Sequence, residues 1–309
     1  MNGHIPVLLE ECIKYLNIKP DGVYVDGTLG MGGHSEAILQ RLTTGRLISI
    51  DRDELAIERA GERLKAYSER LTIVHGNFRD LDEILDEQGV TAVDGMLFDL
   101  GVSSPQLDEG SRGFSYMLEA PLDMRMDKAD NIDAWFIVNR WPEEKIMRIL
   151  RDYGEERHAA RIAKAIAARR EEKEIQTTTE LVEVIKAAMP AAALREKQHP
   201  AKRSFQAIRI AVNDELGAVA AMMDAAPDRL KQGGRLCVIS FHSLEDRIVK
   251  NAIHARENGC TCPREAPVCT CGFVQTLRSV TRKPITAGGE ELELNPRSRS
   301  AKLRVAERV

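Results

Sequence analysis

The sequence predicts an α/β protein whose parallel sheet is interrupted by a helical insertion. Strand-like and helix-like patterns alternate over residues 23–100, which is typical of a parallel sheet with right-handed crossovers. The alternation stops over residues 109–215, where no segment has a convincing strand pattern, and resumes at residues 234–241. We therefore expect a sheet domain formed by residues 1–108 and 216–309, and an inserted helical domain formed by residues 109–215.

The first part of the chain supplies four of the expected strands. Each is an apolar run, and three of the four end in aspartate: 23–26, 46–51, 71–75 and 93–99. Helical spacing of apolar residues predicts helices over 8–16 and 53–66, and a glycine-rich turn leads into another over 36–42. Insertions at the carboxyl ends of such strands border the ligand crevice of open α/β sheets, so the insertion is placed to hold a substrate.

The insertion has its own helical patterns. A loop rich in glycine, serine and proline comes first, and helices are then expected over 142–152, 158–170, 178–188 and 202–216. Pro142 and the segment Thr177-Thr-Thr-Glu180 mark two of the helix starts. After the insertion, a turn at residues 232–234 precedes the strand at 234–241, and the final strand is expected over 300–306.

Composition favours a globular protein of the cytoplasm. The chain has 309 residues, of which 43% are hydrophobic and 30% charged. Its start lacks the pattern of a signal peptide, and no apolar run approaches the roughly 18 residues that span a bilayer, so we expect no membrane association. Because the net charge is −4, a nucleic-acid partner would require a local basic surface. The sequence does not indicate whether the chain is a monomer or a dimer.

The glycine-rich turn after the first strand predicts a site for a nucleoside-bearing cofactor. Gly30, Gly32 and Gly33 allow a close approach between backbone and ligand. A dinucleotide site would have a third glycine where this chain has Ser35. The pattern Asp26-x-Thr28-x-Gly30-x-Gly32 instead resembles motif I of class I (Rossmann-like) S-adenosylmethionine-dependent methyltransferases, with Thr28 in place of the usual first glycine.

The second and third strands each lead to a residue with two possible roles. Asp51 ends the second strand, where its carboxylate would accept hydrogen bonds from both ribose hydroxyls or cap the following helix, a task that Asp53 could also perform. Phe78 follows the third strand, and its ring would pack on adenine or belong to the core.

The end of the fourth strand is the expected position of the reacting group. Asp99 lies where methyltransferases that alkylate an exocyclic amine often carry Asp, Asn or Ser followed by two prolines and an aromatic residue. Here Leu100 and Gly101 replace the prolines, and no aromatic residue follows. A carboxylate that accepts the amine hydrogens makes the nitrogen more nucleophilic; alternatively Asp99 only contacts the cofactor. His242 follows a later strand beside the same crevice as a substrate contact or a structural histidine, and Ser243-x-x-Asp246 predicts a helix cap.

Long segments of the chain resemble the MraW/RsmH family of 16S ribosomal RNA cytosine-N4 methyltransferases, almost from end to end. The segments are His4-Ile-Pro-Val-Leu-Leu9, Asp26 to Ser35, Phe98 to Asp108, Arg112-Gly-Phe-Ser115, Pro121 to Met126, Phe205 to Arg209, Ser240 to Arg247 and Asn295 to Arg299. The resemblance implies a methyltransferase domain with an inserted helical domain, and S-adenosylmethionine as cofactor. It implies cofactor contacts at Gly32, Gly33, His34, Asp51, Phe78, Asp99 and Gln106.

The resemblance also implies a substrate. It is a cytidine in the decoding region of 16S ribosomal RNA, within the small ribosomal subunit, methylated at N4. In such a reaction Asp99 would hold the amine, helped by the backbone or by Ser103. Two other functions stay open: an amino-methyltransferase acting on another RNA or on DNA, and a non-catalytic, cofactor-binding ribosome assembly factor.

Several side chains are candidates for contact with RNA. Phe114, Tyr116 and Trp135 would stack on an exposed base or belong to the core. Candidates for phosphate contact are the basic residues without dense acidic neighbours: Lys202, Arg203, Arg209, Arg278, Arg282, Lys283, Arg297 and Arg299. Binding through such residues is expected to weaken with salt.

Four of the six cysteines form a paired C-x-C cluster: Cys260, Cys262, Cys269 and Cys271. In a reducing cytoplasm such a cluster predicts four thiolates around one structural zinc ion rather than disulfides, although the spacing is tighter than in the common C-x-x-C knuckle. Cys12 and Cys237 are expected to be buried apolar residues.

Overall fold

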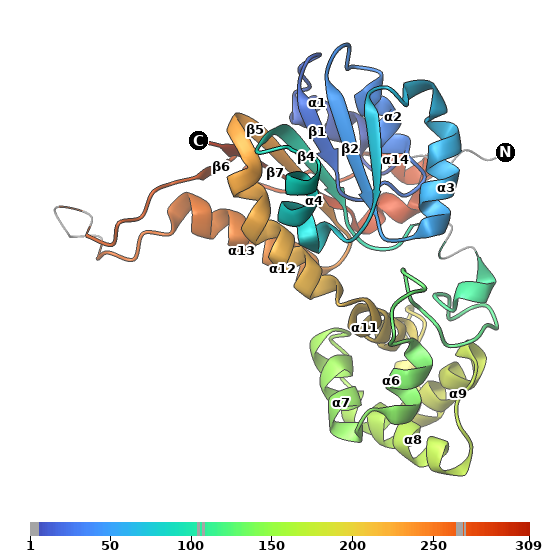
Figure 1. The fold of residues 1–309 in the computed structure, drawn as a ribbon. Helices are drawn as coiled ribbons and strands as arrows, with labels where there is room; N and C mark the ends of the chain where they lie inside the picture. The colour runs from blue at the N-terminus through green and yellow to red at the C-terminus, as the bar shows by residue number, and fades with distance from the viewer. Residues whose placement is uncertain (1–5, 104–105, 107–108, 264–267, 269) are drawn as a thin grey trace. The chain divides into compact units, whose positions relative to one another are not determined.

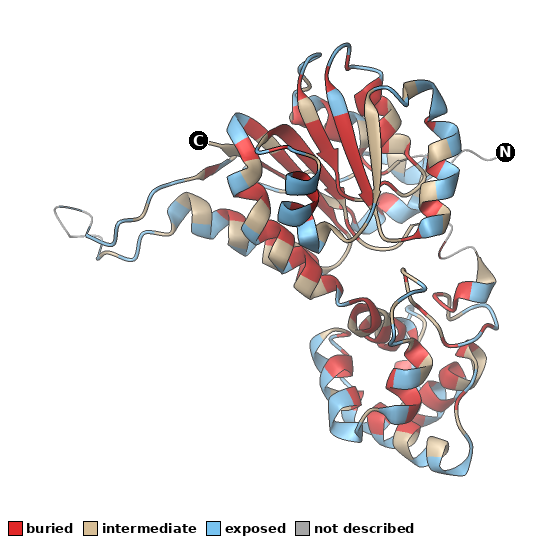
Figure 2. Cartoon of the chain, in the orientation of Figure 1, coloured by how far each residue is buried: buried red, intermediate tan, exposed pale blue. Residues whose placement is uncertain are grey.

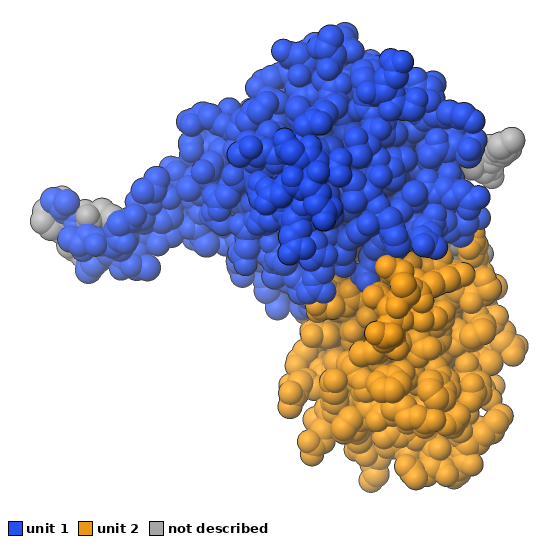
Figure 3. Space-filling view, viewed as in Figure 1, with its two compact units in different colours: residues 1–101, 216–309 blue, residues 102–215 orange. Residues whose placement is uncertain are grey.

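The computed structural model describes residues 6–103, 106, 109–263, 268 and 270–309. The chain divides into two compact units (Figure 3). The first is formed by residues 1–101 and 216–309, and the second by residues 102–215. The second unit therefore begins at Val102, directly after the loop that follows the fourth strand, rather than at the expected residue 109.

Within the described residues the first unit contains a seven-stranded sheet in the order β3-β2-β1-β4-β5-β7-β6 (Figure 1). The strands are β1 Val23–Asp26, β2 Arg46–Asp51, β3 Leu71–His75, β4 Val93–Asp99, β5 Leu230–Ser240, β6 Leu277–Ser279 and β7 Lys302–Arg308. Strands β1 to β5 are parallel to one another, and β7 is antiparallel to both of its neighbours, β5 and β6. The α/β fold class expected from the alternation of patterns is confirmed.

Side chains of the central strands alternate between two cores. In β1, Val25 joins one core and Tyr24 the other; in β4, Phe98 and Leu97 are divided in the same way. Successive side chains of a strand point to opposite faces, and a parallel sheet is covered on both. This is why these strands are almost continuously apolar in sequence and buried throughout (Figure 2).

Helices of the first unit cover both faces of the sheet (Figure 1). One core contains apolar residues of α4, α12 and α13, and the other those of α1, α2 and α3. The helices of this unit are α1 Leu9–Leu16, α2 Gly33–Leu39, α3 Glu54–Arg63, α4 Leu81–Glu87, α12 Glu215–Ala225, α13 Ser243–Asn258 and α14 Gly289–Leu294. None of the helices in the described part of the chain combines the length and apolarity required to cross a bilayer.

Two expected boundaries were wrong. The turn expected at residues 232–234 lies inside β5, where Gly233 has φ +74° and the register with β4 shifts between Val93 and Gly95. The extra residues form a bulge, which a left-handed glycine accommodates. The single helix expected over 202–216 is two helices, because Asp214 adopts φ +45° between α11 and α12.

The second unit is helical around one core. Its helices are α6 Ala134–Arg140, α7 Glu143–Asp152, α8 Ala159–Glu172, α9 Thr178–Ala188, α10 Ala191–Leu194 and α11 Lys202–Asn213. The capping box expected at Thr177 and Glu180 is present, since each side chain bonds the backbone of the other. Among the described residues of this unit, the one β-type pairing is an isolated bridge between Pro121 and Thr177. This agrees with the lack of a strand pattern in its sequence.

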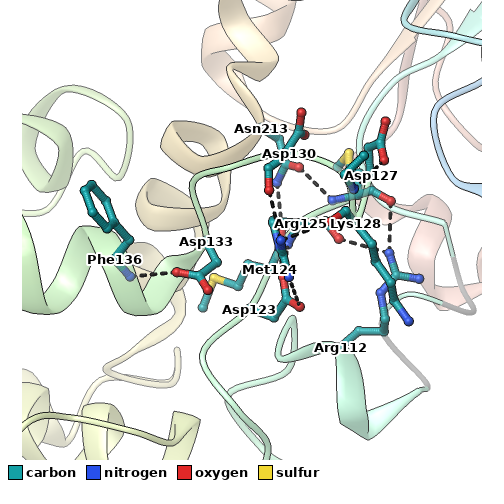
Figure 4. Close-up of polar contacts among 12 residues, drawn as sticks. Arg112, Asp123, Met124, Arg125, Asp127, Lys128, Asp130, Asp133, Phe136 and Asn213 are labelled. Atoms are coloured by element: carbon teal, nitrogen blue, oxygen red, sulfur yellow. Dashed lines mark hydrogen bonds and ion pairs between the residues drawn. The ribbon is translucent and has the colours of Figure 1, made fainter.

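A buried asparagine fixes the loop over residues 121–130 of the second unit (Figure 4). Asn213, at the end of α11, accepts a hydrogen bond from the Met126 N–H (2.8 Å) through Oδ1 and donates to the Met124 carbonyl (2.8 Å) through Nδ2. The guanidinium of buried Arg112 donates to the carbonyls of Arg125 and Met126 (2.9 and 3.0 Å). Met124 adopts φ +61°, so these bonds hold a backbone conformation that its own sequence does not favour.

We expect Asn213→Ala to destabilise the second unit by ~2–4 kcal/mol. The substitution removes the hydrogen bonds that the Asn213 side chain forms with the Met126 N–H and the Met124 carbonyl. The measurement is the midpoint of denaturant unfolding followed by circular dichroism. Exposed Lys128 lies in the same loop, and Lys128→Ala is the matched control, expected to change stability by less than ~0.5 kcal/mol. Equal midpoints for Asn213→Ala and the control would contradict the role assigned to Asn213.

Candidate functional site

The candidate site of the first unit lies at the carboxyl ends of β1, β2 and β4. β1 is paired with β2 on one side and with β4 on the other, so the chain changes direction across the sheet at β1. Open α/β sheets bind ligands at such a switch point, outside the carboxyl ends of the strands. Asp26, Asp51 and Asp99 are the last residues of these three strands.

Asp26 serves as an internal anchor. Its carboxylate is fully buried, and it accepts hydrogen bonds from the Thr28 N–H (3.2 Å) and the Ser35 hydroxyl (2.6 Å). Ser35 also lies within 2.8 Å of the Ser49 hydroxyl on β2. Burial raises the pKa of Asp26, and the hydrogen bonds from Ser35 and Thr28 oppose that rise. Asp26 thus ties the glycine turn and α2 to the sheet, and Ser35 replaces the third glycine because it is needed in this anchor.

The glycine turn has two residues in the left-handed region. Gly30 has φ +50°, and Gly32, the residue before α2, has φ +76°. At Gly33 a Cβ atom would lie 2.3 Å from Cγ of Pro6, so the N-terminal segment packs directly on the turn. Gly32 is therefore required by its conformation, and Gly33 by the space that Pro6 occupies.

Asp51 holds the turn through both carboxylate oxygens. Oδ2 accepts a hydrogen bond from the Gly30 N–H (2.7 Å), and Oδ1 accepts one from the Asp53 N–H (2.9 Å). The cap of α3 is Asp53, which accepts from the Leu55 N–H at 3.2 Å, so Asp51 does not cap that helix. Burial raises the pKa of Asp51 to about 6, although these backbone bonds lower it. Each oxygen of a carboxylate has a second lone pair, so Asp51 can still accept two hydroxyl hydrogens.

Asp99 lies beside the turn and beside His34. Its N–H donates to the Thr28 hydroxyl at 2.6 Å, and its Oδ2 lies 3.8 Å from Nδ1 of His34. Nε2 of His34 lies 3.0 Å from the Val7 carbonyl. Because a carbonyl cannot donate, Nε2 carries the proton, and in the neutral ring Nδ1 is the accepting nitrogen that faces Asp99.

The carboxyl of Asp99 keeps one oxygen available for a ligand. Oδ1 forms no hydrogen bond with the described residues, while the side chain as a whole is 22% exposed. Burial raises the pKa of Asp99 well above its usual range, and the negative charges of Asp26 and Glu245 raise it further. A buried oxygen without a partner is costly, and Oδ1 of Asp99 can accept a hydrogen bond from a ligand at the strand ends.

Phe78 and Cys237 are placed by the sheet as well. Phe78 begins a short 3₁₀ helix after β3, is half-buried, and packs edge-on to Phe98 with ring centroids 5.8 Å apart. The core reading of this ring is therefore partly correct, and contact with adenine stays a prediction. Cys12 and Cys237 are fully buried, as expected.

His242 caps the start of α13, a role that the sequence pattern predicted for Ser243. Nδ1 of His242 accepts from the Glu245 N–H (3.4 Å), and Oε2 of Glu245 accepts from the His242 N–H (3.3 Å). This is a capping box at the start of α13, so the cap predicted at Ser243-x-x-Asp246 was wrong by one residue. Asp246 instead pairs with Arg304 at 2.7 Å and Lys302 at 3.3 Å on β7. Capping accounts for His242 as a structural residue; a substrate contact stays a prediction.

We expect His242→Ala to lower the free energy of unfolding by about 1 kcal/mol, the usual cost of losing an N-cap acceptor. His242→Asn is expected to restore stability, because an asparagine oxygen caps helices well. Thermal unfolding of both variants measures this, and equal midpoints for the alanine and asparagine variants would contradict the capping role. Because stability is restored in His242→Asn, a lower turnover of this variant than of the wild type would indicate a contact between His242 and the substrate.

Ser103 and Gln106 belong to the second unit. Oε1 of buried Gln106 accepts a hydrogen bond from the Ser103 N–H at 3.0 Å, which connects the two residues. Residues 104–105 and 107–108 lie outside the described residues. The predicted contacts of Ser103 with the substrate and of Gln106 with the cofactor stay predictions.

The aromatic candidates of the second unit all pack in or against its hydrophobic core. Phe114 is buried, and Trp135 packs against the same core. Tyr116 packs against that core, stacked on His199 with ring centroids 4.6 Å apart. Each of these contacts supports the core reading over base stacking.

Two of the basic candidates have acidic partners, contrary to expectation. Arg209 forms a two-pronged ion pair with Glu215 (2.7 and 2.8 Å), and Arg278 pairs with Glu307 at 2.7 Å. Arg203 donates to the Glu155 carbonyl. Five further candidates are exposed: Lys202, Arg282, Lys283, Arg297 and Arg299.

Sequence reasoning missed two contributors to the site. The Thr28 hydroxyl accepts the Asp99 N–H, and the Val7 carbonyl fixes the His34 ring. The signal for Thr28 was present, since a threonine in place of the usual first glycine offers a hydroxyl at the strand end. Val7 acts through its backbone, and backbone groups leave no signal in the residue type.

The strand order, the glycine turn after β1 and the acids at the ends of β1, β2 and β4 define the class I (Rossmann-like) methyltransferase fold. The family model of the MraW methylase family matches residues 1–309, and the chain belongs to that family.

Relatives agree over the whole chain. It is 55% identical over 308 residues to "Ribosomal RNA small subunit methyltransferase H" of Heliobacterium mobile, covering 99% of both chains. It is 54% identical over 307 residues to the protein of the same name from Brevibacillus brevis, covering 99% of this chain and 98% of the relative. With that of Clostridioides difficile it shares 53% over 307 residues, covering 99% of each.

Proposed function

We propose that this chain transfers a methyl group from S-adenosylmethionine to the exocyclic N4 of a cytidine in the decoding region of 16S ribosomal RNA, in the cytoplasm. The observation that carries the proposal is Asp99 at the end of β4, beside the glycine turn, whose buried Oδ1 has no hydrogen-bond partner among the described residues. Membership of the MraW methylase family supports methyl transfer, and the names of the relatives support a small-subunit RNA substrate. The cytidine and its N4 rest on the resemblance of the sequence segments.

The residues of the turn fit the cofactor. Gly32 lets the turn adopt its left-handed conformation, and the second lone pairs of Asp51 would accept the ribose hydroxyls. His34 is held by Val7 with its Nδ1 toward Asp99. Phe78 and Gln106 complete the proposed set of contacts. The bound cofactor would supply a methyl group on a positively charged sulfur.

The chemistry that the chain must provide is orientation and charge stabilisation. N4 would take the methyl group of a bound cofactor with cleavage of the sulfur–methyl bond, the amine would take up the positive charge, and N4 would then lose one proton. An acceptor at Asp99 holds the amine in line and favours the transition state, in which that charge develops. Because burial raises the pKa of Asp99, an ionised Asp99 is also a better acceptor for the departing proton.

Ser103 and His242 complete the proposed catalytic residues. Ser103 would orient the amine through its backbone or hydroxyl, and His242 would contact the substrate in addition to capping α13. The exposed basic residues would bind phosphates around the target base, which must be unstacked because pairing hides its N4. The predicted zinc ion has no part in this reaction.

The proposal is tested by incubating the protein with cofactor labelled in the methyl group and three acceptors. The acceptors are small ribosomal subunits that lack the modification, protein-free 16S RNA, and duplex DNA. We expect label in 16S RNA, most strongly where the RNA is presented in the subunit. The same reaction without protein is the control for background transfer.

Other outcomes would identify the alternatives. Label in DNA alone would favour an amino-methyltransferase with another substrate. Cofactor binding and subunit binding without any labelling would favour a non-catalytic assembly factor. Either result would contradict the proposed function.

A further inference from the structure

Residues 259–263, 268 and 270–276 of the first unit lie between α13 and β6, and we call these described residues the cysteine arm. Figure 1 shows them extending away from the sheet. Cys260 and Cys262 lie on its outgoing side and Cys271 on its returning side. Their three sulfur atoms lie within 4.8 Å of one another, and the sulfurs of Cys260 and Cys271 are 3.6 Å apart. Cys269 lies outside the described residues.

The distance between the sulfurs is that of ligands around one metal ion. Zinc–sulfur bonds of about 2.3 Å in a tetrahedron place the sulfur atoms about 3.8 Å apart. A disulfide would require a separation of about 2.05 Å. The separation of 3.6 Å between Cys260 and Cys271 is therefore close to the first arrangement and far from the second.

Hydrogen bonds in the arm favour a thiolate. The sulfur of Cys262 accepts from the Thr270 N–H at 3.2 Å, and the Thr270 hydroxyl lies 3.7 Å away. The thiolate is the form that binds metal, and a hydrogen bond donated to its sulfur stabilises it.

The arm has little apolar packing of its own. Val268 and Val274 are 70% and 73% exposed. At its base, the ring of Phe273 lies so close to Gly259 that a Cβ there would meet it at 2.7 Å. A short exposed segment that cannot bury a core gains order from a metal ion, because binding free energy becomes folding free energy.

We propose that Cys260, Cys262 and Cys271 bind one zinc ion that joins the two sides of the cysteine arm. Three thiolates occupy three positions of the tetrahedron and leave one for a further ligand. The arm lies outside the glycine turn and the acids at the strand ends, so the ion is structural. The proposal does not depend on the proposed methyl transfer, and either can fail without the other.

The test is metal analysis of the full chain purified without chelator, by inductively coupled plasma mass spectrometry. We expect about one equivalent of zinc per chain in the wild type and less than about a tenth in Cys262→Ser. Thr261→Ala is the matched control, since Thr261 is exposed, lies between the two cysteines and offers no sulfur; it should retain the zinc. Wild-type protein with less than about a tenth of an equivalent, or with iron and sulfide instead, would overturn the proposal. Equal zinc in Cys262→Ser and the wild type would do the same.

A second measurement does not depend on how well the serine variant folds. Zinc is removed from the wild-type protein with a chelator, and limited proteolysis is followed with the fragments mapped by mass. We expect faster cleavage within residues 259–276 after removal, restored when zinc is returned, with cleavage elsewhere unchanged. Cleavage of the arm at the same rate with and without zinc would contradict the ordering role.

Discussion

Replacing Asp99 with alanine is expected to lower kcat for methyl transfer by ~10²–10³-fold, the usual cost of losing one group that stabilises developing charge. The loss should fall mainly on kcat, because the amine needs this acceptor most as positive charge appears on it. Single-turnover rates with saturating cofactor measure the chemical step. Cofactor affinity is measured separately by calorimetry, since Asp99 also lies beside the glycine turn.

Two further variants make this result specific. Asp99→Asn keeps the shape of the side chain without its negative charge, and it should be nearly as slow as the alanine variant. Asp21→Ala removes an exposed aspartate before the opposite end of β1 and should retain the wild-type rate. Wild-type turnover in Asp99→Ala would remove Asp99 from the chemistry.

Cofactor affinity is expected to fall about tenfold as the pH is lowered from 7 to 5, because the pKa of Asp51 is about 6. The ionised carboxylate is the form that accepts the ribose hydroxyls. Above pH 6 the ionised form predominates. Below pH 6 the ionised fraction falls about tenfold for each unit by which the pH is lowered. Calorimetric titrations at several pH values, with constant ionic strength, measure the effect.

The variant Asp51→Asn identifies the titrating group. It should bind the cofactor between ~10-fold and ~100-fold more weakly at pH 7, because hydrogen bonds to a charged group are lost. Its affinity should no longer change between pH 7 and pH 5. Asp53→Asn is the matched control, since asparagine also caps helices, and it should keep the pH dependence. A pH dependence that persists in Asp51→Asn would assign the titration to another residue.

Strand ends were the most predictable part of the site. Buried parallel strands are apolar throughout, so an aspartate that ends such a run is visible in the sequence, and Asp26, Asp51 and Asp99 all lie at strand ends. Their individual tasks were less visible. Whether Asp51 or Asp53 caps α3 depends on backbone geometry, and the structure assigns the cap to Asp53.

The errors have physical causes of the same kind. Apolar spacing continues across Asp214, so nothing in the pattern marked the left-handed residue that separates α11 from α12. Serine is a common N-cap and histidine a rare one, which is why the cap was expected at Ser243 instead of His242. Arg209 appeared unpaired because its partner, Glu215, is brought near only when the chain turns at Asp214.

Identifying the methylated nucleoside tests whether the methyl group is transferred to a cytosine amine. Small-subunit RNA labelled by the protein is digested to nucleosides, which are resolved by chromatography and mass spectrometry, and the labelled fragment is mapped on 16S RNA. We expect N4-methylcytidine from a position in the decoding region, absent when Asp99→Ala replaces the wild-type protein. Label in 5-methylcytidine, in a ribose methyl group or in another base would contradict it.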